Sequence, residues 1–461
     1  MSRPSLGVGV TASAAEIGGL IGLGRVCMLC DMKRRLRSLF PVGLLALSLG
    51  TLGLADPSAP ELTARIEKLV SRYAEYGYLN GTVLLARHGT VLYAKGVGDA
   101  NMQSHAPNTP QTKFGIASVT KQFTAVLVLQ QVAEGKIGLY GKISDYLAWY
   151  RKDTGSRMTI EQVLHHTAGL PADFELPEFS DSEAAKQHFE PQEFAEKKCE
   201  PSLVSEPGTE WNYSNCGYLL LGLVLERVTG KPFDELLRER LLEPLGMKDT
   251  GMDRNDLAER GGATGYMRHA GARYTVGPYL DRSHIYAAGA MYSTAEDLLR
   301  WTQALSEGGV IPKEIREQVF RPGLGNWGYG WFITKIPAGA PGEGNTMAEM
   351  RGDMPGNYFS WILRFPEKEA VIIVLRNGYG STERLEQNLQ AIVFDAEPQI
   401  PSRSLKDLAA RAWWTPEEWV SSHGRLSAIL LVVVSGMIWM GLRRRRDIRA
   451  NGIPGQLGGR P

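Results

Sequence analysis

The sequence lacks the signatures of several common classes of enzyme and binding protein. It contains no G-x-S-x-G stretch, which an α/β-hydrolase needs for its nucleophile elbow. Its eight histidines are scattered rather than grouped with acidic residues, so no ligand set for a catalytic metal can be recognised. The net charge of +1 offers no electrostatic attraction for nucleic acid. We therefore expect no metal, no cofactor and no nucleic-acid partner.

Cysteine is also scarce, with four residues in the chain. Cys27 and Cys30 form C-x-x-C, a spacing known from redox and metal sites, but they precede a segment with the layout of an export signal. Removal of that signal would leave Cys199 and Cys216 as the only pair. A disulfide between them and two free thiols are both compatible with the sequence.

The N-terminal segment differs in composition from the rest of the chain. Residues 1–31 are rich in glycine and alanine without periodicity, and we expect an extension outside the folded body, with Met32 as an alternative start. Residues 32–55 combine a basic stretch, an apolar run and small residues at the end, which is the layout of a secretory signal peptide. We predict cleavage after Ala55. An uncleaved N-terminal anchor is the alternative.

The remaining chain divides into a domain and a C-terminal segment. Residues 56–396 are predicted to form a globular domain, and residues 397–425 a linker. The apolar run 426–442 is about long enough for a transmembrane helix, and four arginines follow it directly. The positive-inside rule then makes 443–461 a cytoplasmic tail and places the domain outside the cytoplasm, in the periplasm or at the cell surface. A buried helix of the domain and a tail that is removed during sorting are the alternatives.

One short motif is typical of nucleophilic catalysis. Ser118 and Lys121 form the only Ser-x-x-Lys of the chain, where an apolar stretch from Val119 to Glu134 predicts a buried helix. Positions i and i+3 of a helix share a face, so the hydroxyl and the amine lie side by side. Desolvation by the apolar helix favours the neutral, basic form of Lys121, which can activate a serine. The alternative is an ordinary helix start with a solvated lysine.

A second motif precedes another apolar helix. Tyr213 and Asn215 lie on a predicted loop just before Leu219 to Val228. From there a tyrosine can reach a site at the tip of another helix, although packing in a core is the more common role of an isolated tyrosine. The adjacent His165 and His166 point to different faces and have no further histidine at metal-binding spacing. We expect a structural or hydrogen-bonding role for this pair.

These motifs resemble those of a known family. The stretch from Val83 to Asn377 resembles serine β-lactamases and penicillin-binding proteins, specifically the class C branch, which includes D-alanyl-D-alanine carboxypeptidases and carboxylesterases. Ordered landmark stretches carry the resemblance: Ser118-Val119-Thr120-Lys121, His166-Thr167-Ala168-Gly169-Leu170, Tyr213-Ser214-Asn215, Pro244-Leu245-Gly246-Met247, the segment 289–298 and Tyr329-Gly330-Trp331. The resemblance implies an α/β (α+β) fold, with an antiparallel sheet built from both ends of the chain, flanking helices and a mostly helical subdomain.

The same resemblance implies an acyl-enzyme mechanism. Ser118 would attack a carbonyl carbon, and Lys121 and Tyr213 would share the proton transfers. Asn215 would orient Lys121 or a substrate amide. Backbone N–H groups of Ser118 and of a residue on the edge strand would bind the oxyanion.

The third motif of the family departs from its usual pattern. The stretch Met354-Pro355-Gly356 aligns the chain so that Met350, Arg351 and Gly352 occupy the place of Lys-Thr-Gly or His-x-Gly. Gly352 keeps the room that a substrate needs against the strand, and Asp353 would offer the oxyanion N–H. Arg351 can supply a cation only if it faces the site, because adjacent strand residues point to opposite faces.

The methionine at position 350 disfavours efficient turnover of β-lactams or of peptides that carry a free carboxylate. We therefore predict an exported, membrane-tethered serine hydrolase that acts on an ester or amide bond of a small molecule or peptide. The alternatives are a penicillin-recognising D-alanyl-D-alanine carboxypeptidase or β-lactamase, and a non-catalytic binding domain of the same fold.

Overall fold

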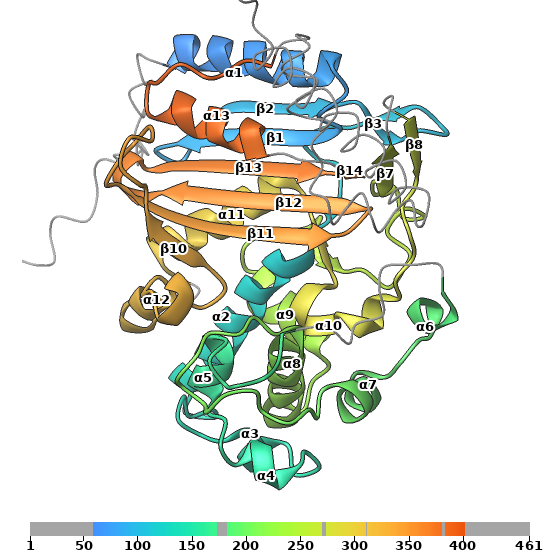
Figure 1. Cartoon of the computed structure of the whole chain (residues 1–461), viewed down its shortest axis with the longest axis vertical. Helices are drawn as coiled ribbons and strands as arrows, with labels where there is room; N and C mark the ends of the chain where they lie inside the picture. Colours follow the sequence, from blue (N-terminus) through green and yellow to red (C-terminus); the bar gives the residue numbers. More distant parts are fainter. Residues whose placement is uncertain (1–58, 173–181, 270–272, 310, 380–382, 402–461) are drawn as a thin grey trace, which may run out of the picture. The chain divides into compact units, whose positions relative to one another are not determined.

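The computed structural model describes residues 59–172, 182–269, 273–309, 311–379 and 383–401, all of which belong to one unit, Asp56–Pro461 (Figure 1). The predicted extension at 1–31, signal peptide at 32–55, membrane span at 426–442 and tail at 443–461 lie outside the described residues. Within the described ranges, no helix has both the length and the apolar character that crossing a membrane requires.

A six-stranded antiparallel sheet organises the domain, with the strand order β10-β11-β12-β13-β1-β2 (Figure 1). Its strands are β1 (Gly81–Arg87), β2 (Thr90–Val97), β10 (Phe332–Lys335), β11 (Thr346–Met354), β12 (Tyr358–Phe365) and β13 (Ala370–Arg376). β1 pairs with β13, so that Gly81 lies opposite Arg376. The N-terminal hairpin is thereby joined to the C-terminal strands, which confirms the predicted sheet built from both ends of the chain.

Helices α1 (Ala59–Glu75) and α13 (Glu383–Val393) cover one face of this sheet (Figure 1). Leu62, Ile66 and Leu69 of α1 are buried there, as their helical spacing predicts. They belong to one apolar cluster with Trp361 and Leu363 of β12. Side chains on this face of β11, β12 and β13 therefore point toward α1 and α13, and not toward the part of the domain that covers the other face.

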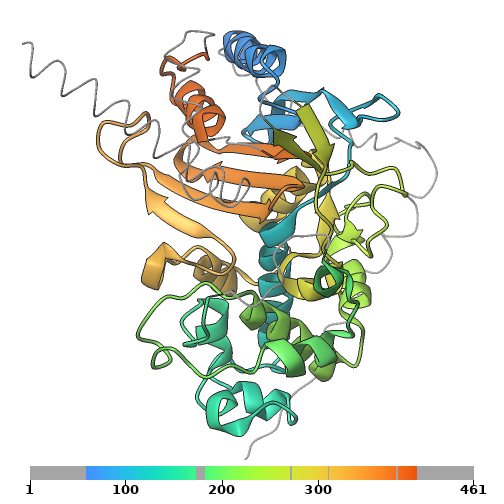
Figure 2. The same cartoon turned by 45° about the vertical axis from the view of Figure 1, so that its right-hand side comes forward.

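The opposite face of the sheet packs against a mostly helical region (Figures 1 and 2). Its longest helices are α2 (Thr120–Ala133), α8 (Asn215–Thr229) and α11 (Ala295–Glu307). The shorter helices are α3 (Ile143–Tyr146), α4 (Lys152–Gly155), α5 (Ile160–Leu164), α6 (Glu183–Lys186), α7 (Pro191–Lys198), α9 (Phe233–Leu237), α10 (Tyr286–Gly289) and α12 (Lys313–Val319). This region confirms the expected helical subdomain.

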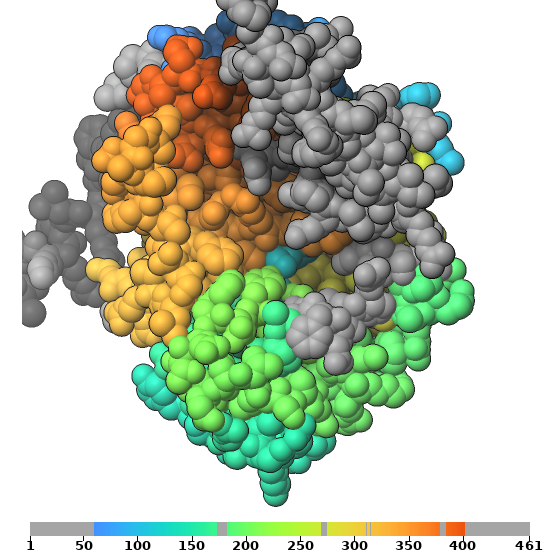
Figure 3. Space-filling view, viewed as in Figure 1, coloured from blue at the N-terminus to red at the C-terminus, as the bar shows by residue number. Residues whose placement is uncertain are grey.

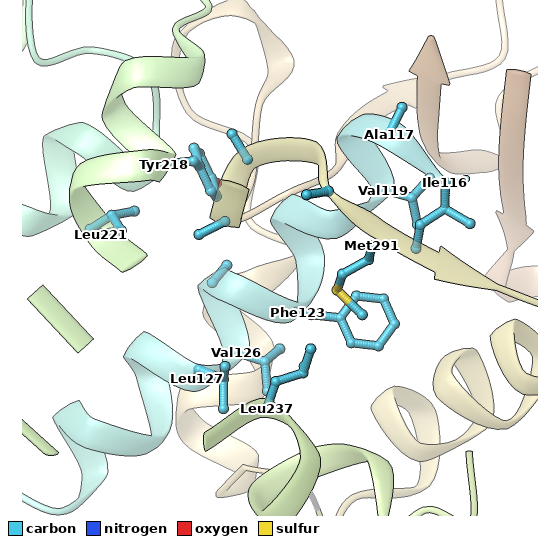
Figure 4. Close-up of a cluster of buried hydrophobic side chains, with 14 of the residues drawn as sticks. Ile116, Ala117, Val119, Phe123, Val126, Leu127, Tyr218, Leu221, Leu237 and Met291 are labelled. Carbon is cyan, nitrogen blue, oxygen red and sulfur yellow. The ribbon is translucent and has the colours of Figure 1, made fainter. Parts of the chain in front are cut away.

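Helix α2 is buried along nearly its whole length, as the apolar stretch from Val119 to Glu134 predicts. Phe123 stacks on Trp301 of α11, with 4.1 Å between the ring centroids. Figure 4 shows Phe123 and Val126 of α2 near Leu237 of α9. Because helices surround it, α2 holds its N-terminal end in a fixed place beside the sheet.

Short strands tie the start of α2 to distant parts of the chain. β5 (Phe114–Gly115) pairs with β9 (Met291–Ser293), which also pairs with β6 (Gly251–Met252). The other small strands are β3 (Asp99–Asn101), β4 (Ala106–Pro107), β7 (Tyr266–His269), β8 (Arg273–Val276) and β14 (Gly378–Tyr379). The β5–β9 pairing places the segment before α2 next to the segment after α10.

Cys199 and Cys216 form a disulfide, with 2.05 Å between the sulfur atoms. The sequence leaves a disulfide and free thiols open, and the structure contains the disulfide. Cys199 follows α7 directly, and Cys216 lies in the first turn of α8. The bond therefore closes the loop that contains Tyr213 and Asn215.

Candidate active site

The predicted nucleophile lies on a tight turn between β5 and α2. Ser118 is the central residue of a short 3-10 helix, η1 (Ala117–Val119). Ala117 has a φ of 45°, a left-handed conformation that costs energy for alanine and that the surrounding contacts must hold. The backbone N–H of Ile116 donates to the carbonyl oxygen of Met291 at 2.9 Å. The Ser360 hydroxyl donates to the carbonyl oxygen of Ile116 at 2.7 Å, which fixes the turn against β12.

Lys121 lies in the first turn of α2 and is fully buried. Its Nζ donates to the Ser118 Oγ at 3.2 Å, to the Asn215 Oδ1 at 2.5 Å and to the carbonyl oxygen of Ala288 at 2.9 Å. The amine is thus aimed at the serine by acceptors from α8 and α10. No sequence pattern identifies the Ala288 carbonyl as a partner, because every residue carries the same backbone group.

Tyr213 approaches the same serine from the loop before α8. Its hydroxyl donates to the Ser118 Oγ at 2.7 Å. The Lys121 Nζ lies 4.8 Å from the centre of the Tyr213 ring. The structure therefore brings Ser118, Lys121, Tyr213 and Asn215 together, although 95 positions of sequence separate Tyr213 from Ser118.

Strand β11 lies against the nucleophile turn. A Cβ atom added to Gly352 would lie 2.0 Å from the carbonyl oxygen of Ile116, so only glycine allows this approach. Met350 is on the same face of β11 and is almost completely buried. β10 pairs with β11 only from Thr346 to Glu349. The stretch that contains Gly352 therefore has no β10 partner and forms the edge of the sheet beside Ser118.

Arg351 and Asp353 of β11 point to the other face of the sheet. The Arg351 guanidinium lies 5.2 Å from the centre of the Trp361 ring and pairs with Glu349. Trp361 belongs to the cluster under α1 and α13, so the structure does not bring the Arg351 side chain to Ser118. The side chain of Asp353 shares that face, and only its backbone can contribute to the site.

The site is open on one side. Figure 3 shows a hollow between the orange strands and the green helical region, in which teal atoms of the α2 segment are visible. Two proton carriers, Lys121 and Tyr213, meet on the Ser118 hydroxyl, and the Asn215 amide oxygen holds Lys121. The described residues contain no group of three or more acidic, histidine or cysteine side chains placed to hold a metal ion. This arrangement can deprotonate a serine hydroxyl and protonate a leaving group.

Comparisons with known proteins agree with this chemistry. A family model described as Beta-lactamase matches residues 66–396. Penicillin-binding protein 4* of Bacillus subtilis strain 168 is 28% identical over 362 residues, which are 73% of this chain and 77% of that protein. Among solved structures, the octameric penicillin-binding protein homologue from Pyrococcus abyssi is 25% identical, with a TM-score of 0.61 over 74% of this chain and 78% of that one. The D-amino acid amidase from Ochrobactrum anthropi SV3 is 26% identical, with a TM-score of 0.60 over 72% of this chain and 96% of that one.

Proposed function

Because this chain belongs to the beta-lactamase family of serine hydrolases, we propose that it hydrolyses an ester or amide bond through an acyl-enzyme formed on Ser118. The observation that supports this proposal most directly is the position of the Ser118 Oγ. It lies within hydrogen-bond distance of both the Tyr213 hydroxyl and the Lys121 Nζ. A serine needs such an adjacent base to become a nucleophile near neutral pH.

The proposed reaction follows from these contacts. The reaction starts from the neutral amine form of Lys121, which burial favours. The Ser118 Oγ attacks the substrate carbonyl carbon while its proton passes to the pair formed by Tyr213 and Lys121. The backbone N–H groups of Ser118 and Asp353 stabilise the oxyanion. The pair then returns the proton to the departing alcohol or amine. Water then attacks the acyl-enzyme by the same sequence of proton transfers. The acyl group is released and the Ser118 hydroxyl is regenerated.

The third motif supports an ester or an amide without a free carboxylate as the substrate. Met350 replaces the cation that the motif usually supplies, and it is buried against the site face of β11. Arg351 does not compensate, because its guanidinium is paired on the opposite face. A substrate carboxylate would therefore lose its hydration at this strand without gaining a cation from it.

A second candidate is a penicillin-recognising carboxypeptidase or β-lactamase. The similarity to penicillin-binding protein 4* favours it. Met350 disfavours it for the reason given above. A non-catalytic binding domain is the third candidate, and the intact contacts of Ser118, Lys121 and Tyr213 disfavour it.

We also propose that the domain is exported and tethered to a membrane. Residues 32–55 have the layout of a signal peptide, and the apolar run 426–442 is followed by four arginines. The Cys199–Cys216 disulfide supports an oxidising compartment, because cytosolic thiols are kept reduced in most organisms.

The intact mass of the protein after exposure to a fluorophosphonate, and separately to a penicillin, tests the reaction. Wild-type protein should gain one fluorophosphonate adduct, and Ser118→Ala should gain none and lose hydrolysis of p-nitrophenyl butyrate by about three orders of magnitude or more. Melting temperatures of both proteins would show that the variant is folded. Hydrolysis that persists in Ser118→Ala would refute the acyl-enzyme.

The penicillin arm separates the candidates. Labelling by the fluorophosphonate alone means an ester or amide hydrolase that excludes β-lactams. Labelling by both reagents supports the penicillin-recognising candidate despite Met350. Labelling by neither supports the non-catalytic domain.

A further inference from the structure

His166 is a buried polar side chain that the proposed reaction does not use. It lies two residues after α5, with 2% of its surface exposed. Its backbone adopts a φ of 56°, in the left-handed region. A histidine holds this conformation only at an energetic cost, so the contacts that it makes possible must compensate.

Those contacts lie on both sides of Tyr213. The backbone N–H of Asn212 donates to the carbonyl oxygen of His166 at 2.8 Å. The backbone N–H of Ser214 donates to the Nδ1 atom of the His166 ring at 3.1 Å. The ring also packs against the Tyr213 ring, with 4.4 Å between the centroids. One residue therefore holds both chain neighbours of Tyr213 and its side chain.

The hydrogen bond from Ser214 fixes the protonation state of the His166 ring. A backbone N–H can only donate, so Nδ1 must be the acceptor and carry no proton. In the neutral ring the proton is then on Nε2, which has no hydrogen-bond partner among the described residues. Burial, together with the nearby Lys121 and His165, lowers the pKa of His166 well below its usual 6.5, so the ring is neutral at neutral pH.

We propose that His166 is a positioning residue: it clamps Asn212 and Ser214 so that the Tyr213 hydroxyl stays on the Ser118 hydroxyl. This inference rests on the proposed function. Its ring is not a proton carrier for Ser118, because Nδ1 is engaged by Ser214 and the ring is buried. Ser214, which donates this hydrogen bond, directly precedes Asn215. The hydrogen bond therefore also orients Asn215, which starts α8 and contacts Lys121.

Two substitutions in the full-length chain separate the hydrogen bond from packing. His166→Phe keeps a ring against Tyr213 and removes the acceptor. His166→Asn places an amide oxygen where Nδ1 lies and tolerates left-handed backbone well. For p-nitrophenyl butyrate, we expect His166→Phe to lower kcat about 10- to 100-fold with KM changed less than about threefold, because a buried N–H loses its acceptor and Tyr213 shifts. His166→Asn should stay within about fivefold of the wild-type kcat.

Fluorophosphonate labelling stoichiometry provides the fraction of competent sites in each preparation. A His166→Phe kcat equal to wild type, after that correction, overturns the clamp. Equal losses in the Phe and Asn variants overturn the acceptor role, because they would report only lost imidazole packing. A wild-type protein that neither labels nor hydrolyses the ester refutes the proposed function itself, which is a distinct outcome.

A measurement on the wild-type chain tests the inference even if a variant does not fold. The protein is labelled with ¹⁵N in its histidine rings, and the His166 signals are assigned by their absence from His166→Asn or by their contacts with the Tyr213 ring. At neutral pH we expect a neutral ring with a protonated Nε2 and a hydrogen-bonded, unprotonated Nδ1. A charged ring, or a proton on Nδ1, would contradict the clamp.

Discussion

Gly352 shows how one missing side chain sets the distance between the sheet and the nucleophile. A Cβ atom at this position would meet the Ile116 carbonyl oxygen at 2.0 Å and the Ser360 Oγ at 2.3 Å. That carbonyl oxygen belongs to the residue just before η1, and it accepts the hydrogen bond from Ser360. An added methyl group must therefore displace either β11 or the turn that carries Ser118.

We predict that Gly352→Ala destabilises the protein by about 1–3 kcal/mol and lowers ester hydrolysis at least about tenfold, because the strand and the turn are forced apart. Gly138→Ala is the matched control. Its new methyl group would lie 3.7 Å from its nearest neighbour among the described residues, the Gly141 nitrogen, and Gly138 is exposed. Thermal melting and p-nitrophenyl butyrate hydrolysis measure both effects. A Gly352→Ala protein that melts and reacts like the control would disprove the steric argument.

Single residues of the site differ in how far the sequence alone identifies them. Ser118 and Lys121 are identified by local spacing, since i and i+3 on a helix are adjacent in any fold. Tyr213 needs the resemblance to a family, because nothing local distinguishes a catalytic tyrosine from a packing one. The sequence predicts a structural or hydrogen-bonding role for His165 and His166, but not the partner of His166, because the Ser214 N–H comes from a segment 48 positions away.

At the scale of elements, the register of β11 decides what the third motif can do. Alternation along a strand shows that Gly352 and Arg351 face opposite sides, but it does not show which side contains the site. In the structure Arg351 lies opposite Trp361 of β12, which belongs to the cluster under α1 and α13. The site is therefore on the other face, the one that Gly352 shares. That register depends on the turn between β11 and β12 and on the apolar faces of both strands, which are long-range properties.

The loop closed by the Cys199–Cys216 disulfide is a second element that the site depends on. It spans 17 positions of sequence and contains Tyr213 and Asn215. A disulfide across a loop of this length is worth about 3 kcal/mol of stability, mainly because it restricts the unfolded chain. It also anchors the first turn of α8 to the end of α7.

We predict that Cys199→Ser together with Cys216→Ser lowers the melting temperature by roughly 5 °C or more, and that a reducing agent has the same effect on wild type. The loop should also open more often, so ester hydrolysis should fall severalfold. Calorimetry and p-nitrophenyl butyrate assays with and without dithiothreitol check this. The double variant provides the control, because dithiothreitol should not change it further. A wild-type melting temperature that ignores the reductant would contradict the prediction.

At the scale of the whole molecule, the described residues contain a complete sheet, its two covering layers and the candidate site. The sequence predicts this architecture through the family resemblance, whereas periodicity alone does not reveal that β1 and β13 are partners. The segments 32–55 and 426–442 lie outside the described residues. The export and membrane tether that we propose for them can therefore be tested separately from the folding of the described domain.

We predict that a chain limited to residues 59–401 folds and labels with fluorophosphonate like the full chain, but remains in the supernatant after membranes are sedimented. If the apolar run 426–442 spans a membrane as we propose, the full chain should sediment with membranes and resist a carbonate wash. Ending the chain at Asn377 is the control for folding. It removes α13 and its buried Leu385 and Leu389, so it should aggregate. A full chain that carbonate releases would disprove the tether and leave the hydrolase unaffected.

During synthesis, the hairpin of β1 and β2 leaves the ribosome long before β13 does. One side of β1 pairs with β2, but its other side pairs with β13, where Gly81 lies opposite Arg376, so that side stays unpaired until almost the entire domain has been made. The nascent polypeptide therefore cannot complete its sheet before the last strands are made. A translocation channel that admits only extended chains would receive it in that form. The final architecture, and with it the chemistry of Ser118, would then arise after passage, once the last strands arrive.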